Sequence, residues 1–409
     1  MTTTRPPVRP GSRASQPEPE EPQAPRAAVV AVRRLFAAET PEYFMLLGTT
    51  LFLVIFGLVM VLSSSSIISF VSSKDFFSIA TRQGIYALIG IPVMLIAARA
   101  PISFWKRWAR IGIFVGIGLQ LLVFSPLGFA YGGNRNWIHL GAFNAQPSEL
   151  VKLAMVLWLA WMLTTRQELL EDWRRMAVTL APIVAIATGL ILAGSDLGTS
   201  VILLSIVLGA LFYAGMRLRV VLSVVVVMAV IGLVAASIRT SRTNRISAWL
   251  SGCTDPSQAS GDCYQTTHGW QALAHGGVFG VGLGNSTGKW SWVPEADNDF
   301  IFSIIGEELG LIGAILVLLL FVLLAICFIR IIRMSRDPFA KIATSAAMVW
   351  IIGQGFVNIA VVLGLLPVLG VPLPLVSAGG SALITTLAAI GVVLSFARHR
   401  PETESVISR

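Results

Sequence analysis

The fold of this chain is decided at residues 300–329, which read FIFSIIGEELGLIGAILVLLLFVLLAICFI. The stretch contains only two charged residues, Glu307 and Glu308, and both lie near its start. A lipid bilayer has a hydrocarbon core about 30 Å thick, which a helix of about 20 apolar residues can cross. We therefore predict that these residues form a membrane-spanning helix.

Similar apolar stretches recur along the chain and predict an all-α, polytopic membrane protein with about ten transmembrane helices. Composition supports this prediction, because 55% of the 409 residues are hydrophobic and only 12% are charged. A soluble protein of this length would carry far more charge. The first forty residues show no apolar core of a cleavable signal peptide, so we expect the first span to direct insertion. The expected spans are residues 43–63, 83–99, 111–129, 148–164, 177–194, 199–216, 219–238, 300–329, 342–365 and 378–397.

Lysine and arginine residues predict the orientation of these spans. They gather in every second connection, for example at Lys106 and Arg107 and again from Arg330 to Lys341. Because basic loops remain on the cytoplasmic side, both termini are expected in the cytoplasm. Two large extracytoplasmic loops, residues 130–147 and 239–299, then lie on the face where we expect the chemistry. The net charge of +9 follows this loop pattern and does not indicate nucleic-acid binding.

The segments outside the membrane domain are expected to be tails. Residues 1–42 are rich in Pro, Ala and charged residues. They cannot bury enough apolar surface to offset chain entropy, so we predict a disordered cytoplasmic tail. The ten-helix membrane domain is then expected at residues 43–398, with a cytoplasmic C-terminal tail at 399–409.

Two of the three cysteines, Cys253 and Cys263, lie close together in the long external loop. Cysteines outside the cytoplasm tend to pair, so we expect a disulfide here, with two free thiols as the alternative. Cys327 lies in the middle of a span and is expected to be an inert core thiol. No group of Cys and His residues has the spacing of a metal site.

Polar residues at membrane depth are costly and mark candidate sites. Glu149 and Lys152 share one face of the predicted helix at 148–164, because they are three residues apart. They form either a structural ion pair or a cationic lining beside an anionic ligand. Asp196, between two spans, either caps the next helix or belongs to the same site.

The richest polar group lies just before residues 300–329. The glycine run at 276–284 matches neither the dinucleotide nor the P-loop fingerprint, so we expect it to turn sharply or approach a ligand closely. Glu295, Asp297 and Asp299 then follow at the mouth of the span. Asp299 alone could cap the helix, but so many carboxylates together favour a site. Farther on, Gln354, Asn358 and the Pro- and Gly-rich residues 367–381 predict a broken segment that forms one wall of it.

Together these motifs resemble the SEDS family of membrane proteins, which comprises FtsW, RodA and a sporulation relative. The resemblance runs from the first span to the last. It is nearer to the FtsW branch, and the long Pro-rich tail and the Ser-Ala-Gly-Gly motif suggest an actinobacterial version. The chain departs from the family pattern at His268, Asn298 and Ala378, where glutamine, threonine and tyrosine are common. The motifs that carry the resemblance are Trp137-Ile138, Gln146-Pro147-Ser148-Glu149 with Lys152, Asp196-Leu197-Gly198, Arg245-Ile246, Tyr264-Gln265, the glycine run, Pro294-Glu295-Ala296, Asp299-Phe300-Ile301-Phe302, Gly306-Glu307-Glu308-Leu309-Gly310, Leu373-Pro374, Ser377 and Gly379-Gly380-Ser381.

The resemblance implies a peptidoglycan glycosyltransferase at the outer face of the cytoplasmic membrane, active in septal cell-wall synthesis. Its substrate would be lipid II, the undecaprenyl-pyrophosphate disaccharide-pentapeptide. Its partners would be a class B penicillin-binding protein, which supplies the transpeptidase, and other divisome membrane proteins. The essential aspartate of the family matches Asp299.

Glycosyl transfer from lipid II needs a general base near the acceptor hydroxyl and positive charge near the leaving phosphates. We expect Asp299 to be the base, with its pKa raised by neighbouring carboxylates. A divalent cation, Mg or Mn, bound by the carboxylates is an alternative to a purely cationic side-chain site. The candidates for binding pyrophosphate are Arg135, Lys152, Arg245 and Lys289. The other candidate substrate-binding residues are Trp137, Gln146, Glu149, Asp196, Gln265, Glu295, Glu307, Glu308 and Ser377.

Two other functions fit parts of the pattern. A lipid II flippase would also have many spans, broken helices and buried charges, and would depend on Glu149 and Lys152 more than on the loop carboxylates. A non-catalytic divisome scaffold for a penicillin-binding protein would tolerate substitution of Asp299.

Overall fold

The computed structural model describes residues 39–398, apart from residues 133, 142, 171, 238–239, 254–260, 262 and 291. Residues 1–38 and 399–409, which make up nearly all of the two predicted tails, lie outside the described residues. The first helix begins at Pro41, two residues before the expected start of the first span. Thr40 caps this helix by accepting a hydrogen bond from the Tyr43 N–H at 3.2 Å.

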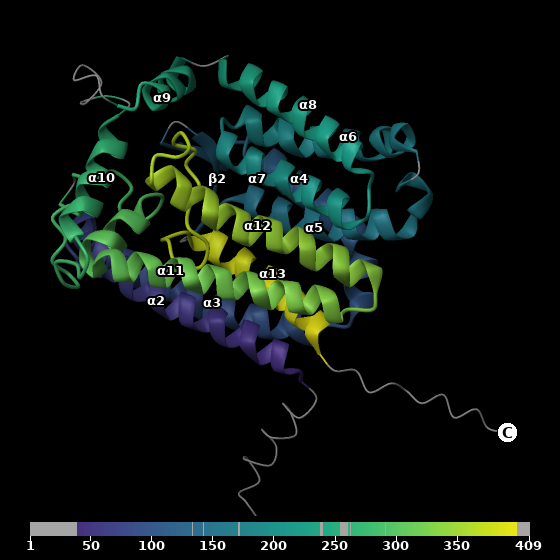
Figure 1. Ribbon diagram of the computed structural model, residues 1–409, viewed down its shortest axis with the longest axis horizontal. Helices are drawn as coiled ribbons and strands as arrows, with labels where there is room; N and C mark the ends of the chain where they lie inside the picture. Colours follow the sequence, from purple (N-terminus) through teal and green to yellow (C-terminus); the bar gives the residue numbers. More distant parts are fainter. Residues whose placement is uncertain are drawn as a thin grey trace, which may run out of the picture. The chain divides into compact units, whose positions relative to one another are not determined.

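Each predicted span corresponds to a helix in the structure (Figure 1). Seven of the described helices, α2, α3, α5, α6, α11, α12 and α13, are long and apolar enough to cross a bilayer, which confirms a multi-pass membrane protein. The remaining three, α4, α7 and α8, are shorter or less apolar, so the number of ten spans stays a prediction. The ten helices are α2 (Pro41–Ser73), α3 (Ser78–Arg99), α4 (Ile102–Leu122), α5 (Pro147–Thr165), α6 (Trp173–Ala193), α7 (Leu197–Tyr213), α8 (Leu218–Ser237), α11 (Ile301–Met334), α12 (Pro338–Val362) and α13 (Gly380–Ala397).

The third span was predicted with the wrong limits. It was expected at residues 111–129, but α4 ends at Leu122, and Gly128–Tyr131 forms strand β1. The apolar run continues past the helix end, so hydropathy alone could not detect the turn at Ser125 and Pro126. Strand β1 pairs with β2 (Asn134–Leu140), and β2 pairs with β3 (Phe143–Ala145), both antiparallel. This small sheet occupies the external loop that was predicted at 130–147.

Burial divides the helices into an interior group and an outer group. Helices α5, α12 and α13 are mostly buried, whereas α3 and α6 expose most of their apolar residues. Helix α12 packs against both α5 and α7. Helix α13 packs against α3, and helix α11 packs against α2. Large apolar side chains such as Leu88, Ile96 and Val178 are more than 70% exposed, as lipid-facing residues would be. The polar side chains on the interior helices are therefore the ones to examine for a site.

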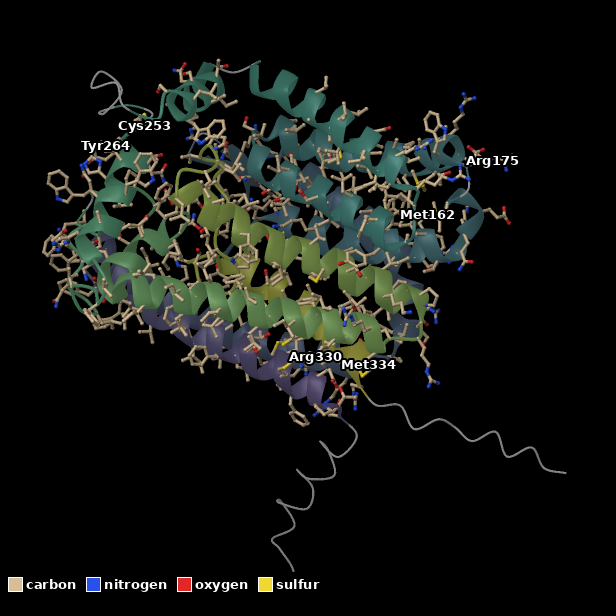
Figure 2. The ribbon with its side chains drawn as sticks, viewed as in Figure 1. Met162, Arg175, Cys253, Tyr264, Arg330 and Met334 are labelled. Carbon is tan, nitrogen blue, oxygen red and sulfur yellow. A yellow bond between two sulfur atoms is a disulfide. The ribbon has the colours of Figure 1, made fainter. Side chains whose placement is uncertain are left out.

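The remaining helices, α9 (Thr240–Leu250) and α10 (Tyr264–Gly276), lie at one end of the helix bundle (Figure 1). Cys253 and Cys263 are bonded as a disulfide between them, with a Cα–Cα distance of 5.6 Å. Figure 2 shows Cys253 and Tyr264 at this end and the basic Arg175 at the opposite end. The predicted orientation, in which Arg175 faces the cytoplasm, stays a prediction. A short 3-10 helix, η1 (Gln167–Leu170), follows α5.

Candidate active site

Helix α11 is broken at Gly310, and the glycine run packs into the break. Gly310 has φ 68° and ψ −166°, a conformation that favours glycine. The Leu311 N–H donates to the Gly277 carbonyl at 2.9 Å, and the Val281 N–H donates to the Glu307 carbonyl at 3.0 Å. A Cβ atom on Gly280 would lie 2.2 Å from the Glu308 carbonyl oxygen. The close approach expected of the glycine run is therefore made to the backbone of α11, and contact of the run with a ligand stays a prediction.

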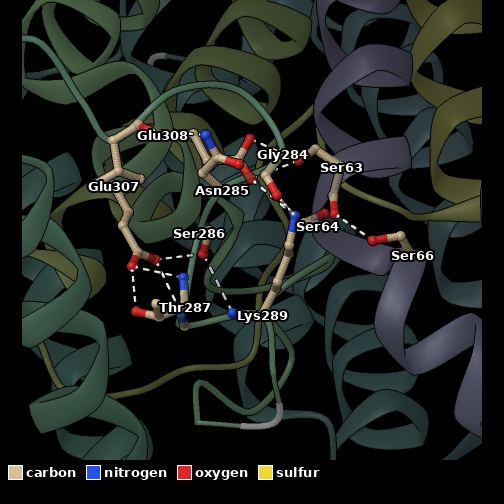
Figure 3. Close-up of polar contacts among 12 residues, drawn as sticks. Ser63, Ser64, Ser66, Gly284, Asn285, Ser286, Thr287, Lys289, Glu307 and Glu308 are labelled. Carbon is tan, nitrogen blue, oxygen red and sulfur yellow. Dashed lines mark hydrogen bonds and ion pairs between the residues drawn. The ribbon is translucent and has the colours of Figure 1, made fainter.

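Glu307 and Glu308 lie beside this break in a buried hydrogen-bond network (Figure 3). Glu307 accepts hydrogen bonds from the Ser286 hydroxyl and from Thr287, whose N–H lies at 3.0 Å and whose hydroxyl lies at 2.8 Å. The Gly288 N–H and the His275 ring also donate to this carboxylate.

Glu308 and Lys289 complete the network. The Ser63 hydroxyl on α2 donates to Glu308 at 2.6 Å, and the Lys289 ammonium lies 3.5 Å from the same carboxylate. Lys289 also donates to the Gly284 carbonyl. These three charged groups hold the 284–289 loop and α2 against α11 (Figure 3). They were predicted to bind substrate, but in the structure their partners are protein groups.

Asp299 lies in a turn just before α11, and its backbone is fixed by distant parts of the chain. The Asn358 side-chain amide donates both to the Asp299 carbonyl at 2.7 Å and to the Val371 carbonyl at 2.8 Å. The Ser377 hydroxyl donates to the Asn298 carbonyl at 2.7 Å, and the Ala378 N–H donates to the Asp297 carbonyl at 2.9 Å. The broken segment predicted at 367–381 thus forms the wall that positions Asp299. Ser377 positions this backbone, and its predicted contact with substrate stays a prediction.

The Asp299 carboxylate itself is left available. Its Oδ1 atom is buried and has no hydrogen-bond partner among the described residues. The alternative that Asp299 caps α11 does not hold, because the N-cap position is Phe300 and no side chain caps this helix. A buried carboxylate oxygen without a partner is destabilising, and such groups are found where function requires them.

Burial and neighbouring charges alter the acidity of this segment. The pKa of Asp299 is raised to about 7. Burial is the largest cause, the negative charges of Glu295, Asp196 and Asp297 also raise the pKa, and the positive charge of Arg245 lowers it. Burial also raises the pKa of Asp297 to about 6. The direction agrees with the expectation for Asp299, but the largest cause is burial, whereas repulsion from neighbouring carboxylates was predicted. Asp196 also contributes across a long sequence separation, which sequence reasoning missed.

Asp196 has two structural roles. Its Oδ1 atom accepts from the Thr199 N–H at 2.9 Å, so the predicted capping of α7 is present. Its Oδ2 atom accepts from the Asn136 side chain at 2.7 Å and from the Gln146 side chain at 3.1 Å. Asp196 and Gln146 therefore connect the external sheet to the start of α5. Trp137, on the same strand as Asn136, packs its ring against Phe129.

Three of the four cations proposed for pyrophosphate are bound to protein groups. The Arg135 guanidinium donates to the carbonyls at the end of α4, including Val123 at 3.2 Å. Lys152 lies 2.9 Å from Glu149 and donates to the Gln354 side-chain oxygen at 3.0 Å. Lys289 is paired with Glu308, so all three cations have partners within the protein. Of the two alternatives for Glu149 and Lys152, the structure shows the ion pair.

Arg245 differs from the other three cations. It is exposed on α9, and no hydrogen bond or ion pair of its side chain is found in the described part of the chain. It lines a cavity of about 50 Å³ together with Trp249, Trp270 and Pro367. Its positive charge also stabilises the ionised form of Asp299. Within the described part of the chain, Arg245 is therefore the predicted cation whose side chain has no hydrogen-bond or ion-pair partner, and its charge acts on Asp299.

Two further candidates and one missed residue complete the site. Gln265 on α10 donates to the Pro294 carbonyl at 3.2 Å, and Glu295 has a positive φ of 53°. The missed residue is Gln83, whose buried side chain donates to the Ser377 carbonyl at 3.0 Å. The sequence signal for Gln83 was its position, because it is a polar residue at the start of the apolar span predicted at 83–99. Across the described ranges, no group of three or more His, Cys, Asp or Glu side chains is placed to hold a metal ion.

Comparison with known proteins gives consistent results. Residues 43–402 match the sequence model of the FtsW, RodA and SpoVE family, described as a cell cycle protein. The probable peptidoglycan glycosyltransferase FtsW of Mycobacterium tuberculosis is 38% identical over 367 residues, which cover 90% of this chain and 70% of that protein. Stage V sporulation protein E of Bacillus subtilis is 36% identical over 364 residues, covering 88% and 98% of the two chains.

Solved structures share the fold. A chain from a peptidoglycan synthase complex that coordinates polymerization and crosslinking aligns with a TM-score of 0.70 and 24% identity, covering 86% of this chain and 96% of that chain. The rod shape determining protein RodA of Thermus thermophilus aligns with a TM-score of 0.64 and 24% identity, covering 90% and 100%. At this identity the two structures support the architecture alone.

Proposed function

Because this chain belongs to the family of cell cycle proteins that includes FtsW, RodA and SpoVE, we propose that it is a peptidoglycan glycosyltransferase of the FtsW type. Its substrate is lipid II, which it polymerises into glycan strands at the outer face of the cytoplasmic membrane. Relatives that are named probable peptidoglycan glycosyltransferases support this activity, and the apolar helices support the membrane location. The proposed place of action is the division septum.

The observation that carries the proposal is the Asp299 carboxylate. The Asn358 side-chain amide donates a hydrogen bond to the Asp299 backbone carbonyl, while the Oδ1 atom of the carboxylate has no described partner. Its pKa of about 7 lies near the ordinary working pH of a cell, where a general base is most effective. The base role does not require Glu307 or Glu308, which are bonded to the protein.

In the proposed reaction, Asp299 accepts the proton of the acceptor GlcNAc 4-hydroxyl while that oxygen attacks C1 of the chain-end MurNAc. The bond between C1 and the lipid pyrophosphate breaks, and the pyrophosphate leaves with the bonding electrons. A single displacement of this kind inverts the anomeric carbon. No second nucleophile is needed, because the attacking oxygen comes from the acceptor sugar.

Arg245 is the residue that we propose to bind the leaving pyrophosphate. A guanidinium matches phosphate oxygens with two parallel hydrogen bonds, which suits it to this task. It lies on α9, and its charge acts on Asp299, so the base and the cation serve one site. The structural pairing of Lys152 and Lys289 leaves them supporting roles.

A class B penicillin-binding protein is the proposed partner, and other divisome membrane proteins are expected around the pair. The support is the similar chain found in a peptidoglycan synthase complex that joins polymerization to crosslinking. A partner with transpeptidase activity would receive the strand that this chain produces.

The deciding experiment is polymerisation of labelled lipid II by the detergent-purified protein with its penicillin-binding partner. We expect Asp299→Asn to abolish strand formation, while Asp75→Asn, a change at an exposed carboxylate between α2 and α3, leaves it intact. Partner association and thermal unfolding of each variant confirm that the complex is folded. Normal polymerisation by Asp299→Asn would refute the base assignment. Lipid II movement across vesicles by a wild type that forms no strands would favour the flippase, and partner binding with neither activity would favour the scaffold.

A further inference from the structure

Three aromatic side chains, Tyr264, His268 and Trp292, are stacked in series beside the site. The ring centroids of Tyr264 and His268 lie 4.0 Å apart with an interplanar angle of 33°. Those of His268 and Trp292 lie 5.7 Å apart at 25°. The proposed chemistry uses none of these rings, and we call them the aromatic stack.

The middle ring of the aromatic stack is held in a fixed orientation. The Nδ1 atom of His268 lies 2.8 Å from the Tyr264 carbonyl oxygen. A carbonyl can only accept, so Nδ1 carries the proton and donates it. Trp292 rests one face of its indole on this fixed imidazole, yet 58% of the residue is exposed.

The aromatic stack is attached to the segment that bears Asp299. Trp292 begins this segment, and the Gln265 side chain on α10 donates to the Pro294 carbonyl at 3.2 Å. A Cβ atom on Gly269 would lie 2.8 Å from the Phe300 ring, so α10 packs directly on the residue after Asp299. Trp292 and the proposed base therefore lie on one short segment, and α10, which carries the other two rings, packs against that segment.

We propose that the exposed face of Trp292 binds a sugar ring of the growing glycan strand, beyond the sugar that reacts. This inference rests on the proposed function, which supplies the glycan. The face of an indole is electron-rich, and the C–H groups on the face of a pyranose are weakly positive, so the two surfaces attract and exclude water. A platform already fixed by His268 loses little conformational freedom on binding.

The surroundings of Trp292 fit an oligosaccharide. Gln265 and Glu295 are partly exposed nearby and offer carboxamide and carboxylate groups to sugar hydroxyl and acetamido groups. The platform is open, which suits a polymer that leaves the site and lengthens by one disaccharide at each cycle. Lipid II, which is tethered to the membrane by its own lipid, would instead approach from the bilayer.

Trp290 provides a matched comparison for Trp292. It is two residues away and 61% exposed, but it stacks on no ring of the described residues. Exposed tryptophans are common at membrane interfaces, and Trp290 fits that role together with the exposed Phe279 and Leu283. Trp292 differs because its ring is supported by a polar imidazole next to the carboxylate segment.

The test measures binding of labelled, lipid-free, uncrosslinked peptidoglycan strands to the full-length protein in complex with its partner. We expect Trp292→Ala to weaken binding about fivefold, which is typical of losing one aromatic contact, and to shorten the strands made from lipid II. Trp290→Ala should leave both unchanged, and Trp292→Phe should restore most of the binding. His268→Gln, which removes the middle ring of the stack, should give an intermediate loss.

Equal strand binding by the wild type and Trp292→Ala, or equal losses in Trp290→Ala and Trp292→Ala, would overturn the inference. Loss of partner association with strand binding intact would also overturn it, because Trp292 would then be a protein-docking residue. If Trp292→Ala fails to fold, Trp292→Phe is compared with His268→Gln. Weaker strand binding by His268→Gln than by Trp292→Phe would support the inference, and equal binding by the two variants would overturn it. The wild type could also bind strands through Trp292 and yet show no polymerase activity. That result would support the binding platform and refute the proposed polymerase function.

Discussion

Asn358 is expected to position the proposed base from inside the membrane domain, and Asn358→Leu tests this directly. The residue is 1% exposed, and its amide group donates two hydrogen bonds, to the carbonyls of Asp299 and Val371. Leucine has nearly the same shape but donates neither. The substitution therefore leaves two buried carbonyl oxygens without these partners.

The expected size of the effect follows from those two bonds. Each buried acceptor that loses its partner costs about 1–3 kcal/mol, so we expect about 2–4 kcal/mol of lost stability once the chain relaxes. A displacement of about 1 Å at the reacting groups can lower a rate about 100-fold, and we expect kcat to fall by that order. KM should change much less, because Asn358 has no proposed contact with substrate.

The assay is lipid II polymerisation by the partner-bound protein, measured as kcat and KM across pH, with thermal unfolding in the same detergent. Looser packing should admit water to Asp299, so its pKa should fall from about 7 toward its ordinary value. A base works when ionised, so the rising limb of the rate should move to lower pH. The control is Gln120→Leu, because Gln120 is fully buried on α4 and neither polar atom of its side chain has a described partner.

A wild-type kcat and pH profile for Asn358→Leu would refute the positioning role, even if the protein were less stable. A loss of stability equal to that of Gln120→Leu would refute the energetic reasoning, since Gln120 loses no hydrogen bond. Should Asn358→Leu fail to fold, Asn358→Ser, which keeps one donor, should retain part of the rate.

Three further outcomes are expected. Glu295→Gln removes a negative charge that raises the pKa of Asp299, so the base should ionise at lower pH. The rising limb of the rate, centred near pH 7 in the wild type, should therefore move to lower pH. An unchanged pH profile of the initial rate would contradict this. Arg245→Ala should lower kcat/KM about 10- to 100-fold in the polymerisation assay, with partial recovery in Arg245→Lys, and equal activity of all three proteins would exclude a role in binding pyrophosphate. Gly280→Ala should lower the free energy of unfolding by at least about 2 kcal/mol, because its φ is 82° and the new Cβ would lie 2.2 Å from a backbone carbonyl oxygen of α11. The control Gly284→Ala, with φ 84° and open space around it, should cost about 1 kcal/mol. Equal losses in thermal unfolding would argue against the close packing.

The helices were predictable because lipid imposes a simple rule on them. A long apolar run such as residues 301–334 has few other stable forms in a bilayer. The end of α4 was not predictable from hydropathy, since the apolar residues continue through Phe124 and Leu127 into a strand. Turns and small sheets in the loops depend on local backbone preferences and long-range pairing, which composition does not reveal.

The raised pKa of Asp299 was predictable, but the partners of the other charged groups were not. Glu307, Glu308 and Lys289 have the composition of a substrate site, and only the structure shows that they bind one another and nearby backbone. The same holds for Arg135, whose partners are the carbonyls at the end of α4. Sequence gives the identity and approximate depth of a charge, whereas its partner depends on tertiary packing. Asp196 illustrates the reverse case, because its effect on Asp299 arises across about a hundred residues of chain.

The side-chain amides of Gln354 and Asn358 on α12 affect which residues of this protein can change during evolution. Gln354 donates to the Pro372 carbonyl at 2.9 Å, and Asn358 donates to the carbonyls of Val371 and Asp299. Every residue type has a carbonyl, so these contacts do not depend on which side chains the loop carries. Substitutions in the loop can therefore reshape the surface around the proposed base, and with it the choice of cell-wall precursor, while the loop keeps its place. The evolutionary constraint falls instead on Gln354 and Asn358, whose side-chain amides hold the loop in place.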